Sequence, residues 1–425
     1  MAARETNKQG CLGCAAVFAL FVGVLMAFVL LIAPSTIGLT IRAYAERAFK
    51  SIGETLGVHR EQDEAPDATL EEPSVSLGAP VSLGNARVEE YLRGKLDEGC
   101  QEVYDQLIAG VRSQEESIAV IDATPEDVSA AYKAMMGDHP EFFWLDGSFT
   151  YMYSSLLKSV TVQLGYEVEP SEVEATRAAI EAEADAILAG LPENATEYDV
   201  ALLAYEHIAS HTDYVVGAPH NQTIQSVLLG HASVCAGYAR TYQYLLQRAG
   251  VFCTYVEGSI PSRGEDHAWN LVRIDGQYAF VDPTWADPTY LGEADSGVSF
   301  DGVIYDYLGL TTADLLRDDH SFADASIWPD CAAPELDFFR RAGLFIDVYD
   351  EQAIDEVFWR QVNEGKSRAA FKFGTNEAYG EALAALAGGT FERDSLLELA
   401  AESGETSIRY SYATSDALRI VKLYW

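Results

Sequence analysis

The most informative segments of the sequence are SVCAGYA (residues 233–239), DHAWNLV (266–272) and VDPTWAD (281–287). They hold a cysteine, a histidine and an aspartate in that order, namely Cys235, His267 and Asp282. In a thiol enzyme the cysteine is the nucleophile, the histidine moves the proton, and a carboxylate orients the imidazole. The three residue types therefore indicate nucleophilic catalysis, provided that the fold brings them together.

The local pattern around these segments predicts how they could meet. A helix is predicted from Cys235 to Ala249, because a glycine follows. Short β-branched and aromatic runs predict strands at 252–257, 269–274 and 278–281. Unpaired amides at a helix N-terminus favour a thiolate and can form part of an oxyanion hole. The turn at Asp275-Gly276 would join two antiparallel strands and place His267 beside Asp282.

These segments resemble the transglutaminase-like superfamily, papain-related thiol enzymes with a Cys, His, Asp triad in that chain order. The resemblance covers about residues 195–320, and DHPEFFW (138–144) is similar to the region that precedes the core in bacterial membrane-anchored members. It implies an α+β fold of the papain-like cysteine protease superfamily. It also implies that Cys235 is the nucleophile, His267 the general base and then acid, and Asp282 the orienting carboxylate.

One departure concerns the oxyanion. Eukaryotic transglutaminases have an oxyanion-stabilising tryptophan a few tens of residues before the cysteine. Here the nearest upstream tryptophan is Trp144, 91 positions before Cys235. Gln222 or Gln225 could take its place.

The charge of the chain excludes one class of partner. The 425 residues include 28 Lys and Arg against 66 Asp and Glu, a net charge of −38. Residues 1–50 hold five basic and two acidic side chains, so the rest of the chain carries −41. Proteins that bind nucleic acid neutralise phosphates with clustered Lys and Arg, so no nucleic-acid partner is expected.

The first 50 residues contain a segment that predicts a membrane anchor. Residues 11–33 form an apolar run of 23 after a short tail at 1–10, and about 20 such residues span a bilayer. A cleaved signal peptide is the alternative, because Ala43-Tyr44-Ala45 resembles a cleavage site, but the run exceeds the usual length. Residues 34–86 read as a flexible linker. The prediction is a single-pass cell-membrane protein with its catalytic domain outside the cytoplasm.

Three further units are expected after the linker. Residues 87–194 read as a mostly helical subdomain with a possible β excursion at 149–166, and residues 195–330 as the transglutaminase-like catalytic core. Helix N-terminal signals stand at Thr124-Pro125, at Ser171 and at Thr196. Residues 331–425 read as a small α/β domain. Its expected helices are 351–363, 376–386 and 395–402, and its expected strands are 367–373, 406–412 and 417–424.

The leading hypothesis is an enzyme that attacks amide or peptide carbonyls of a protein or peptide substrate at the cell envelope through a Cys235 thioester. Hydrolysis is favoured over protein cross-linking, and a non-catalytic surface scaffold is the third reading. No cofactor is required, and no metal site is expected. His207 and His211 have the spacing of a metal-ligand pair but lack the adjacent glutamate of a zinc protease, and His320 reads as a structural residue.

Overall fold

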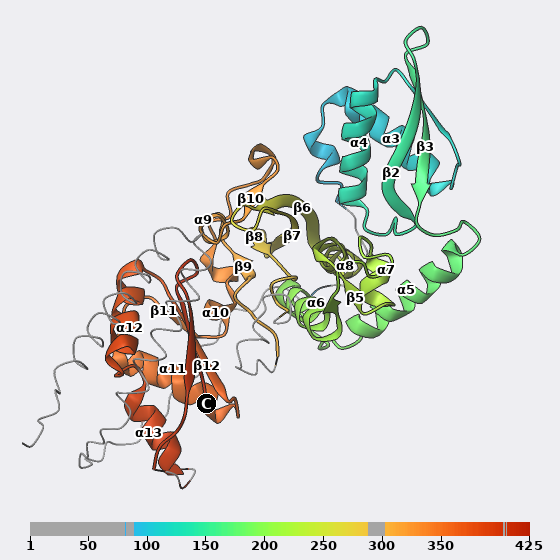
Figure 1. The fold of residues 1–425 in the computed structure, drawn as a ribbon. Coiled ribbons are helices and arrows are strands. Elements are labelled where there is room, and N and C mark those ends of the chain that lie inside the picture. Colours follow the sequence, from blue (N-terminus) through green and yellow to red (C-terminus); the bar gives the residue numbers. More distant parts are fainter. Residues whose placement is uncertain (1–80, 82–88, 288–301, 403, 405) are drawn as a thin grey trace, which may run out of the picture. The chain divides into compact units, whose positions relative to one another are not determined.

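A five-stranded antiparallel sheet of order β10-β6-β7-β8-β9 forms the centre of the computed structural model (Figure 1). Its strands are β6 (Phe252–Ile260), β7 (Glu265–Ile274), β8 (Gln277–Val281), β9 (Leu308–Leu310) and β10 (Ser321–Phe322). The three strands expected from the sequence are confirmed, and β6 and β7 extend further toward their connecting turn. This longer hairpin places His267 inside a strand.

The structure describes residues 81, 89–287, 302–402, 404 and 406–425. The predicted tail, the apolar segment 11–33 and all of the linker 34–86 except Val81 lie outside these residues. Among the helices of the described part, none is long and apolar enough to cross a membrane.

Helix α8 (Cys235–Arg248) packs against β6 and β7 and begins at the cysteine, as the sequence predicts. It ends before Gly250, whose φ of 80° lies in the left-handed region that glycine adopts without strain. The elements before it are α6 (Glu197–His211), β4 (Asp213–Tyr214), α7 (Ile224–Leu228) and β5 (Ala232–Ser233). Thr196 caps α6 through a capping box with Asp199, also as predicted.

The region before α6 contains more sheet than the sequence analysis expected. Its helices are η1 (Arg93–Lys95), α3 (Glu98–Arg112), α4 (Pro125–Asp138) and α5 (Val173–Leu188). Strands β1 (Ile118–Ile121), β2 (Leu145–Ser154) and β3 (Ser159–Tyr166) form a sheet of order β1-β3-β2. The N-cap expected at Ser171 is wrong: the N-cap is Glu172, and its side chain makes no capping hydrogen bond.

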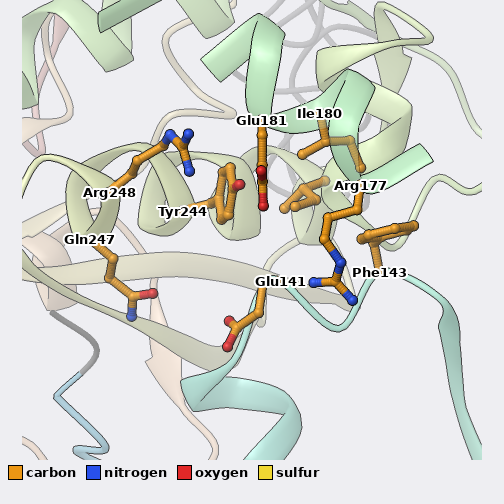
Figure 2. Close-up of a pocket in the computed structure, with 9 residues that line it drawn as sticks. Glu141, Phe143, Arg177, Ile180, Glu181, Tyr244, Gln247 and Arg248 are labelled. Atoms are coloured by element: carbon orange, nitrogen blue, oxygen red, sulfur yellow. The ribbon is translucent and has the colours of Figure 1, made fainter. Parts of the chain in front are cut away.

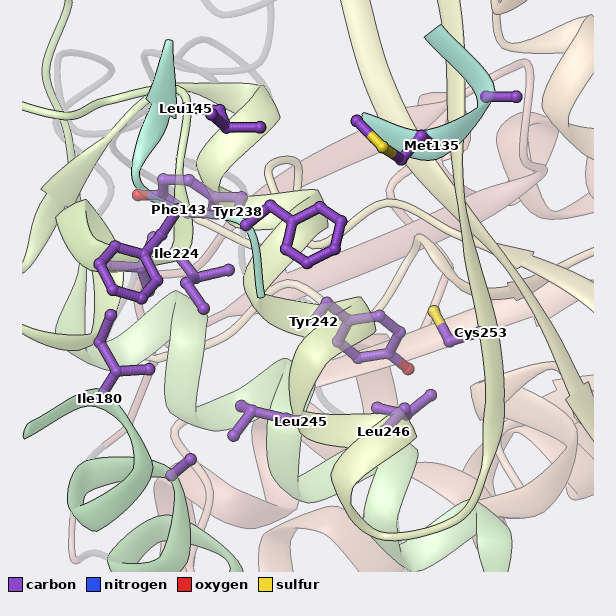
Figure 3. Packing of buried hydrophobic residues seen from close by; sticks show 14 of the residues in the cluster. Met135, Phe143, Leu145, Ile180, Ile224, Tyr238, Tyr242, Leu245, Leu246 and Cys253 are labelled. Atoms are coloured by element: carbon purple, nitrogen blue, oxygen red, sulfur yellow. The ribbon is translucent and has the colours of Figure 1, made fainter. Parts of the chain in front are cut away.

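One hydrophobic cluster joins this region to α8. Figure 3 shows Met135, Phe143 and Leu145 packed with Tyr242, Leu245 and Leu246 of the helix. Polar contacts reinforce the packing, because the Gln243 amide donates to the Gly137 carbonyl at 2.8 Å. The helix that carries Cys235 is therefore packed against the central sheet and also against α4 and the segment that follows α4.

The last elements form a separate four-stranded sheet, of order β11-β12-β14-β13. Helix α9 (Thr312–Arg317) lies between β9 and β10 in the chain. The elements that follow β10 are η3 (Ala325–Ile327), η4 (Pro334–Leu336), α10 (Phe338–Arg341), β11 (Phe345–Ile346), α11 (Glu351–Asn363), β12 (Arg368–Phe373), α12 (Asn376–Gly388), α13 (Arg393–Glu402), β13 (Ser411–Ser415) and β14 (Ile420–Tyr424). The mixture of helices and strands agrees with the expected α/β character. The sequence placed the strand that becomes β13 five residues too early, because a short polar strand has a weak periodic signal.

Candidate active site

Cys235 is the first residue of α8, and the chain just before it is held by close polar packing. Ser233 Oγ lies 2.6 Å from Ser226 Oγ and donates to the Asn221 carbonyl at 3.0 Å. Gly237 lets these groups approach the helix, since a Cβ at that position would lie 1.9 Å from Ser233 Oγ. The cysteine is therefore presented at a helix N-terminus, where free amides and the helix dipole favour negative charge.

His267 and Asp282 meet because of the β7–β8 register. The hairpin turn at Asp275-Gly276 has positive φ at both residues, 52° and 78°, as a two-residue hairpin turn requires. It pairs Asn270 with Val281, so β8 ends one residue before Asp282. His267 Nε2 lies 2.6 Å from Asp282 Oδ2, and the side chain of Cys235 interacts with the same imidazole and helps to raise its pKa. The structure therefore brings all three residues together in the expected order.

Asp282 is fully buried and its carboxylate is saturated with donors. Oδ1 accepts from the backbone amides of Thr284 at 2.9 Å and Trp285 at 3.4 Å. Oδ2 accepts from His267 and also from His320, whose Nε2 lies 3.1 Å away. An ionised carboxylate has about four acceptor sites, and here each is used.

These contacts determine the charges of the pair. Burial alone would lower the pKa of His267, but the charge and hydrogen bond of Asp282, with a smaller contribution from Cys235, raise it to about 10. Burial alone would raise the pKa of Asp282, but His267 and His320 hold it below its usual value. At neutral pH the imidazolium of His267 therefore faces the thiol, and an adjacent imidazolium stabilises a thiolate.

His320 is the site residue that the sequence analysis missed. It is 2% exposed and reaches the site through β10, which pairs with β6. The ring packs against Trp269 and Trp285, with ring centroids 5.1 and 4.6 Å away. In the sequence, the histidine itself is the only signal of this role. It reaches Asp282 through the pairing of β10 with β6 and not through a local motif.

The only group of possible metal ligands close enough to share an ion within the described residues is His267, Asp282 and His320, whose ligand atoms lie within 4.8 Å of one another. A metal ligand must present a free lone pair, whereas both histidines direct Nε2–H toward the carboxylate. An ion would therefore have to displace two protons. His207 and His211 stack, with ring centroids 4.2 Å apart, and His211 Nδ1 faces the His207 carbonyl at 3.0 Å.

The other cysteines of the described chain have surroundings unlike those of Cys235. Cys100, Cys253 and Cys331 are buried free thiols. Burial raises the pKa of Cys100 to about 11 and that of Cys331 to about 12, so both stay protonated at neutral pH. Cys253 lies in the hydrophobic cluster shown in Figure 3, where burial also raises its pKa.

A separate pocket of about 180 Å³ lies over α5 and α8 (Figure 2). Glu141, Phe143, Arg177, Ile180, Glu181, Ile224, Tyr244, Gln247 and Arg248 line it. Its arginines already have partners, because Arg248 binds Asp185 at 2.7 Å and Arg177 lies 3.5 Å from Glu174. None of the three candidate catalytic residues lines this pocket, so its chemistry is separate from that of Cys235.

Comparison with known proteins identifies the same part of the chain. Residues 186–283 match the family model of the transglutaminase-like superfamily. Kyphoscoliosis peptidase of Homo sapiens is 27% identical over 191 residues, which cover 41% of this chain and 28% of that protein. Kyphoscoliosis peptidase of Mus musculus is 30% identical over 137 residues, which cover 28% of this chain and 20% of that protein. The chain thus spans less than a third of the length of these relatives.

A crystal structure of a TGase is 15% identical and covers 32% of this chain and 44% of that one, with a TM-score of 0.24, which is too low to support a conclusion. The family assignment therefore depends on the sequence matches. The region that contains Cys235, His267 and Asp282 belongs to the transglutaminase-like superfamily.

Proposed function

We propose that this protein is a cysteine-dependent amide hydrolase that cleaves a protein or peptide substrate through a thioester on Cys235. The observation that carries the proposal is that His267 lies between the other two side chains: it is hydrogen-bonded to Asp282 at 2.6 Å and interacts with the side chain of Cys235. Asp282 keeps the imidazole charged, and the imidazolium stabilises a thiolate at a helix N-terminus. This arrangement supplies an activated nucleophile and an acid within contact of it.

The reaction follows from these positions. The Cys235 thiolate attacks the carbonyl carbon, and amides at the start of α8 face the developing oxyanion. His267 then gives a proton to the leaving amine as the C–N bond breaks, which leaves a thioester and a neutral imidazole. Water attacks the thioester while His267 takes its proton. Release of the carboxylic acid restores the thiolate and imidazolium. Since Nε2 of His267 is bound to Asp282, Nδ1 is the nitrogen that exchanges the proton.

The first test measures the reactivity of each thiol. The full chain is treated with iodoacetamide at mildly acidic pH, and labelling of each cysteine is followed by mass spectrometry. Cys235 should react much faster than Cys100 and Cys331, whose pKa values are raised by burial. Equal rates would contradict an activated thiol and would favour the non-catalytic scaffold.

The second test separates hydrolysis from cross-linking. Wild type, Cys235→Ala and the matched control Cys100→Ser are incubated with envelope proteins and a labelled primary amine. We expect new amino termini in wild type and in Cys100→Ser, and none in Cys235→Ala. Amine incorporation that depends on Cys235, without new termini, would instead assign protein cross-linking.

The location of the reaction is part of the proposal. Residues 11–33 have the length and apolarity of a membrane-spanning helix, which supports a single-pass anchor with the catalytic region outside the cytoplasm. The protein should stay in the membrane fraction after alkaline extraction and should be digested by protease added to intact cells. Release by alkali, or protection from the protease, would overturn the anchor or its orientation respectively.

A further inference from the structure

His320 is buried beside the three candidate catalytic residues, and the reaction above gives it no role. Its Nε2 lies 3.1 Å from Asp282 Oδ2, the same oxygen that accepts from His267. We propose that His320 is a positioning residue, whose Nε2–H holds the Asp282 carboxylate in the orientation that keeps His267 directed at Cys235. The inference rests on the proposed function, because it concerns the reactivity of that cysteine.

The direction of the hydrogen bond follows from the acceptor. An ionised carboxylate can only accept, so Nε2 of His320 must carry the proton. Asp282 stays ionised because its pKa is held low despite complete burial. The two backbone amides of Thr284 and Trp285 occupy Oδ1 only. Without His320, therefore, Oδ2 would have a single donor, and that donor is the residue Asp282 is meant to orient.

The surroundings of His320 hold its ring in place. The ring stands edge-on to Trp269 at an interplanar angle of 88° and lies against Trp285. The backbone is held as well, since the His320 amide donates to the Leu315 carbonyl at 3.2 Å. The neighbouring Asp319 accepts from the Ser262 amide at 2.7 Å. A donor held this firmly can restrain the carboxylate that it contacts.

A packing role makes the opposite prediction about substitutions. If only the aromatic ring mattered, phenylalanine would replace it well and glutamine poorly. If the donor matters, glutamine should replace it, because its amide nitrogen stands the same number of bonds from Cα as Nε2 of histidine. Tyr307 also interacts electrostatically with Asp306 and Asp318 beside this site. These residues are the same in both variants, so they do not account for a difference between the two labelling rates.

The experiment compares His320→Phe with His320→Gln in the full chain, solubilised in detergent. Iodoacetamide labelling of Cys235 is measured at mildly acidic pH, and circular dichroism and thermal unfolding report folding. We expect His320→Phe to label about tenfold more slowly than wild type, the equivalent of one pKa unit, and His320→Gln to stay within about threefold of wild type. Equal rates in the two variants, or slower labelling in His320→Gln, would overturn the inference.

The same measurement separates this inference from the proposed function. Slow labelling of Cys235 in wild type itself, no faster than that of Cys100, would defeat both. Fast labelling in wild type, unchanged in His320→Phe, would leave the activated thiol in place and remove the role of His320 alone. If His320→Phe does not fold, the rate for His320→Asn decides. Its shorter side chain cannot reach Oδ2, so a rate like that of wild type would overturn the inference and a slower rate would support it.

Discussion

Asp282 and Asp337 are both buried carboxylates, yet their surroundings differ. Asp282 accepts hydrogen bonds from two backbone amides and two histidines. Asp337 pairs with the ammonium group of Lys372, which is itself 1% exposed. Burial disfavours charge at both sites, but the donors lower the pKa of Asp282, whereas burial prevails at Asp337 and raises its pKa. At Asp282 the charge of His267 and the hydrogen bonds of the converging donors together outweigh burial, whereas at Asp337 the ammonium of Lys372 does not.

The positions of the two carboxylates suit two different tasks. Asp282 follows β8 and contacts the histidine that faces the thiol. Asp337 precedes α10, where it also caps the helix by accepting from the Phe339 amide at 2.9 Å. No free cysteine in the described chain contacts Asp337 through a hydrogen bond in the structure. We therefore expect loss of Asp337 to affect stability, and loss of Asp282 to affect reactivity.

The largest effect is expected for Asp337→Asn. The substitution leaves the Lys372 ammonium buried without its main counter-charge, which costs about 3 kcal/mol of unfolding free energy. The estimate is at the low end of the usual range because Asp314 lies 4.0 Å from the same ammonium. Denaturant unfolding measures the loss. The control is Asp347→Asn, since Asp347 forms an exposed pair with Arg340 and such pairs contribute little. Equal losses in the two variants would contradict the buried pair.

The second expected effect is a loss of thiol reactivity in Asp282→Asn. Without the carboxylate charge, His267 no longer keeps its raised pKa, and the thiolate loses its partner. Burial then lowers the pKa of His267, and the imidazole becomes neutral. Loss of an opposite charge beside the thiolate is worth about two pKa units, so labelling of Cys235 at mildly acidic pH should fall about 100-fold. Asp337→Asn should label at the wild-type rate wherever it remains folded. A similar fall in both variants would mean that labelling reports stability and not the site.

The Cys-His-Asp set could be predicted from sequence because each member has a local signal. Cys235 begins a helix that glycine ends, and the Asp275-Gly276 turn sets the register that brings Asp282 to His267. His320 lacks such a signal. It lies 38 residues after Asp282, and only the pairing of β10 with β6 brings it back to the site. A two-residue strand is too short to show a periodic pattern of apolar residues, so the sequence does not predict the contact that it makes.

The same limit explains what the sequence missed in the fold. Thr124 and Thr196 were recognised as helix caps because each has an acid three residues later that completes the capping box. Of the sheet β1-β3-β2, the sequence indicated only a possible β excursion at 149–166, since β1 has four residues and joins through long-range pairing with β3. Features set by neighbouring residues, such as helix caps, could therefore be predicted from the sequence, whereas the long-range pairing of short strands could not.

A third buried carboxylate, Asp138, sharpens the comparison with a smaller effect. Burial raises its pKa to about 6, although the amides of Leu92 and Arg93 donate to it at 2.9 Å. Because the folded pKa exceeds the ordinary value, the folded state gains stability as pH falls through about 6. Asp138→Asn keeps one acceptor oxygen, so we expect a change of about 1 kcal/mol at neutral pH and loss of that pH dependence. Denaturant unfolding across this range provides the measurement.

The outcome that contradicts this prediction is equally specific. A loss in Asp138→Asn as large as in Asp337→Asn would mean that the charge of Asp138 is needed. Hydrogen-bond donors alone would then not explain why the loss of Asp138 and the loss of Asp337 affect stability differently. The matched control is Asp185→Asn, because Asp185 pairs with Arg248 at the surface and its pKa is lowered, chiefly by that hydrogen bond.

The smallest expected change is in the pH dependence of labelling. The folded pKa of His267 is raised to about 10, above the ordinary value of about 6.5. The stability from its charged form is therefore fully present below about pH 6.5 and is lost as pH rises through about 10. At all pH values well below about 10 the imidazolium of His267 persists. Labelling of Cys235 should therefore vary by less than about threefold from mildly acidic to neutral pH.

His267→Gln is the variant that tests this reasoning. It keeps a side chain able to hydrogen-bond but removes the titrating charge, so labelling should rise steeply with pH as an ordinary thiol ionises. The difference in unfolding free energy between wild type and His267→Gln should also shrink as pH rises through about 10. A flat profile in both proteins would mean that the helix N-terminus alone stabilises the thiolate. Asp282 would then orient a neutral imidazole, and its four hydrogen bonds would serve geometry and not charge.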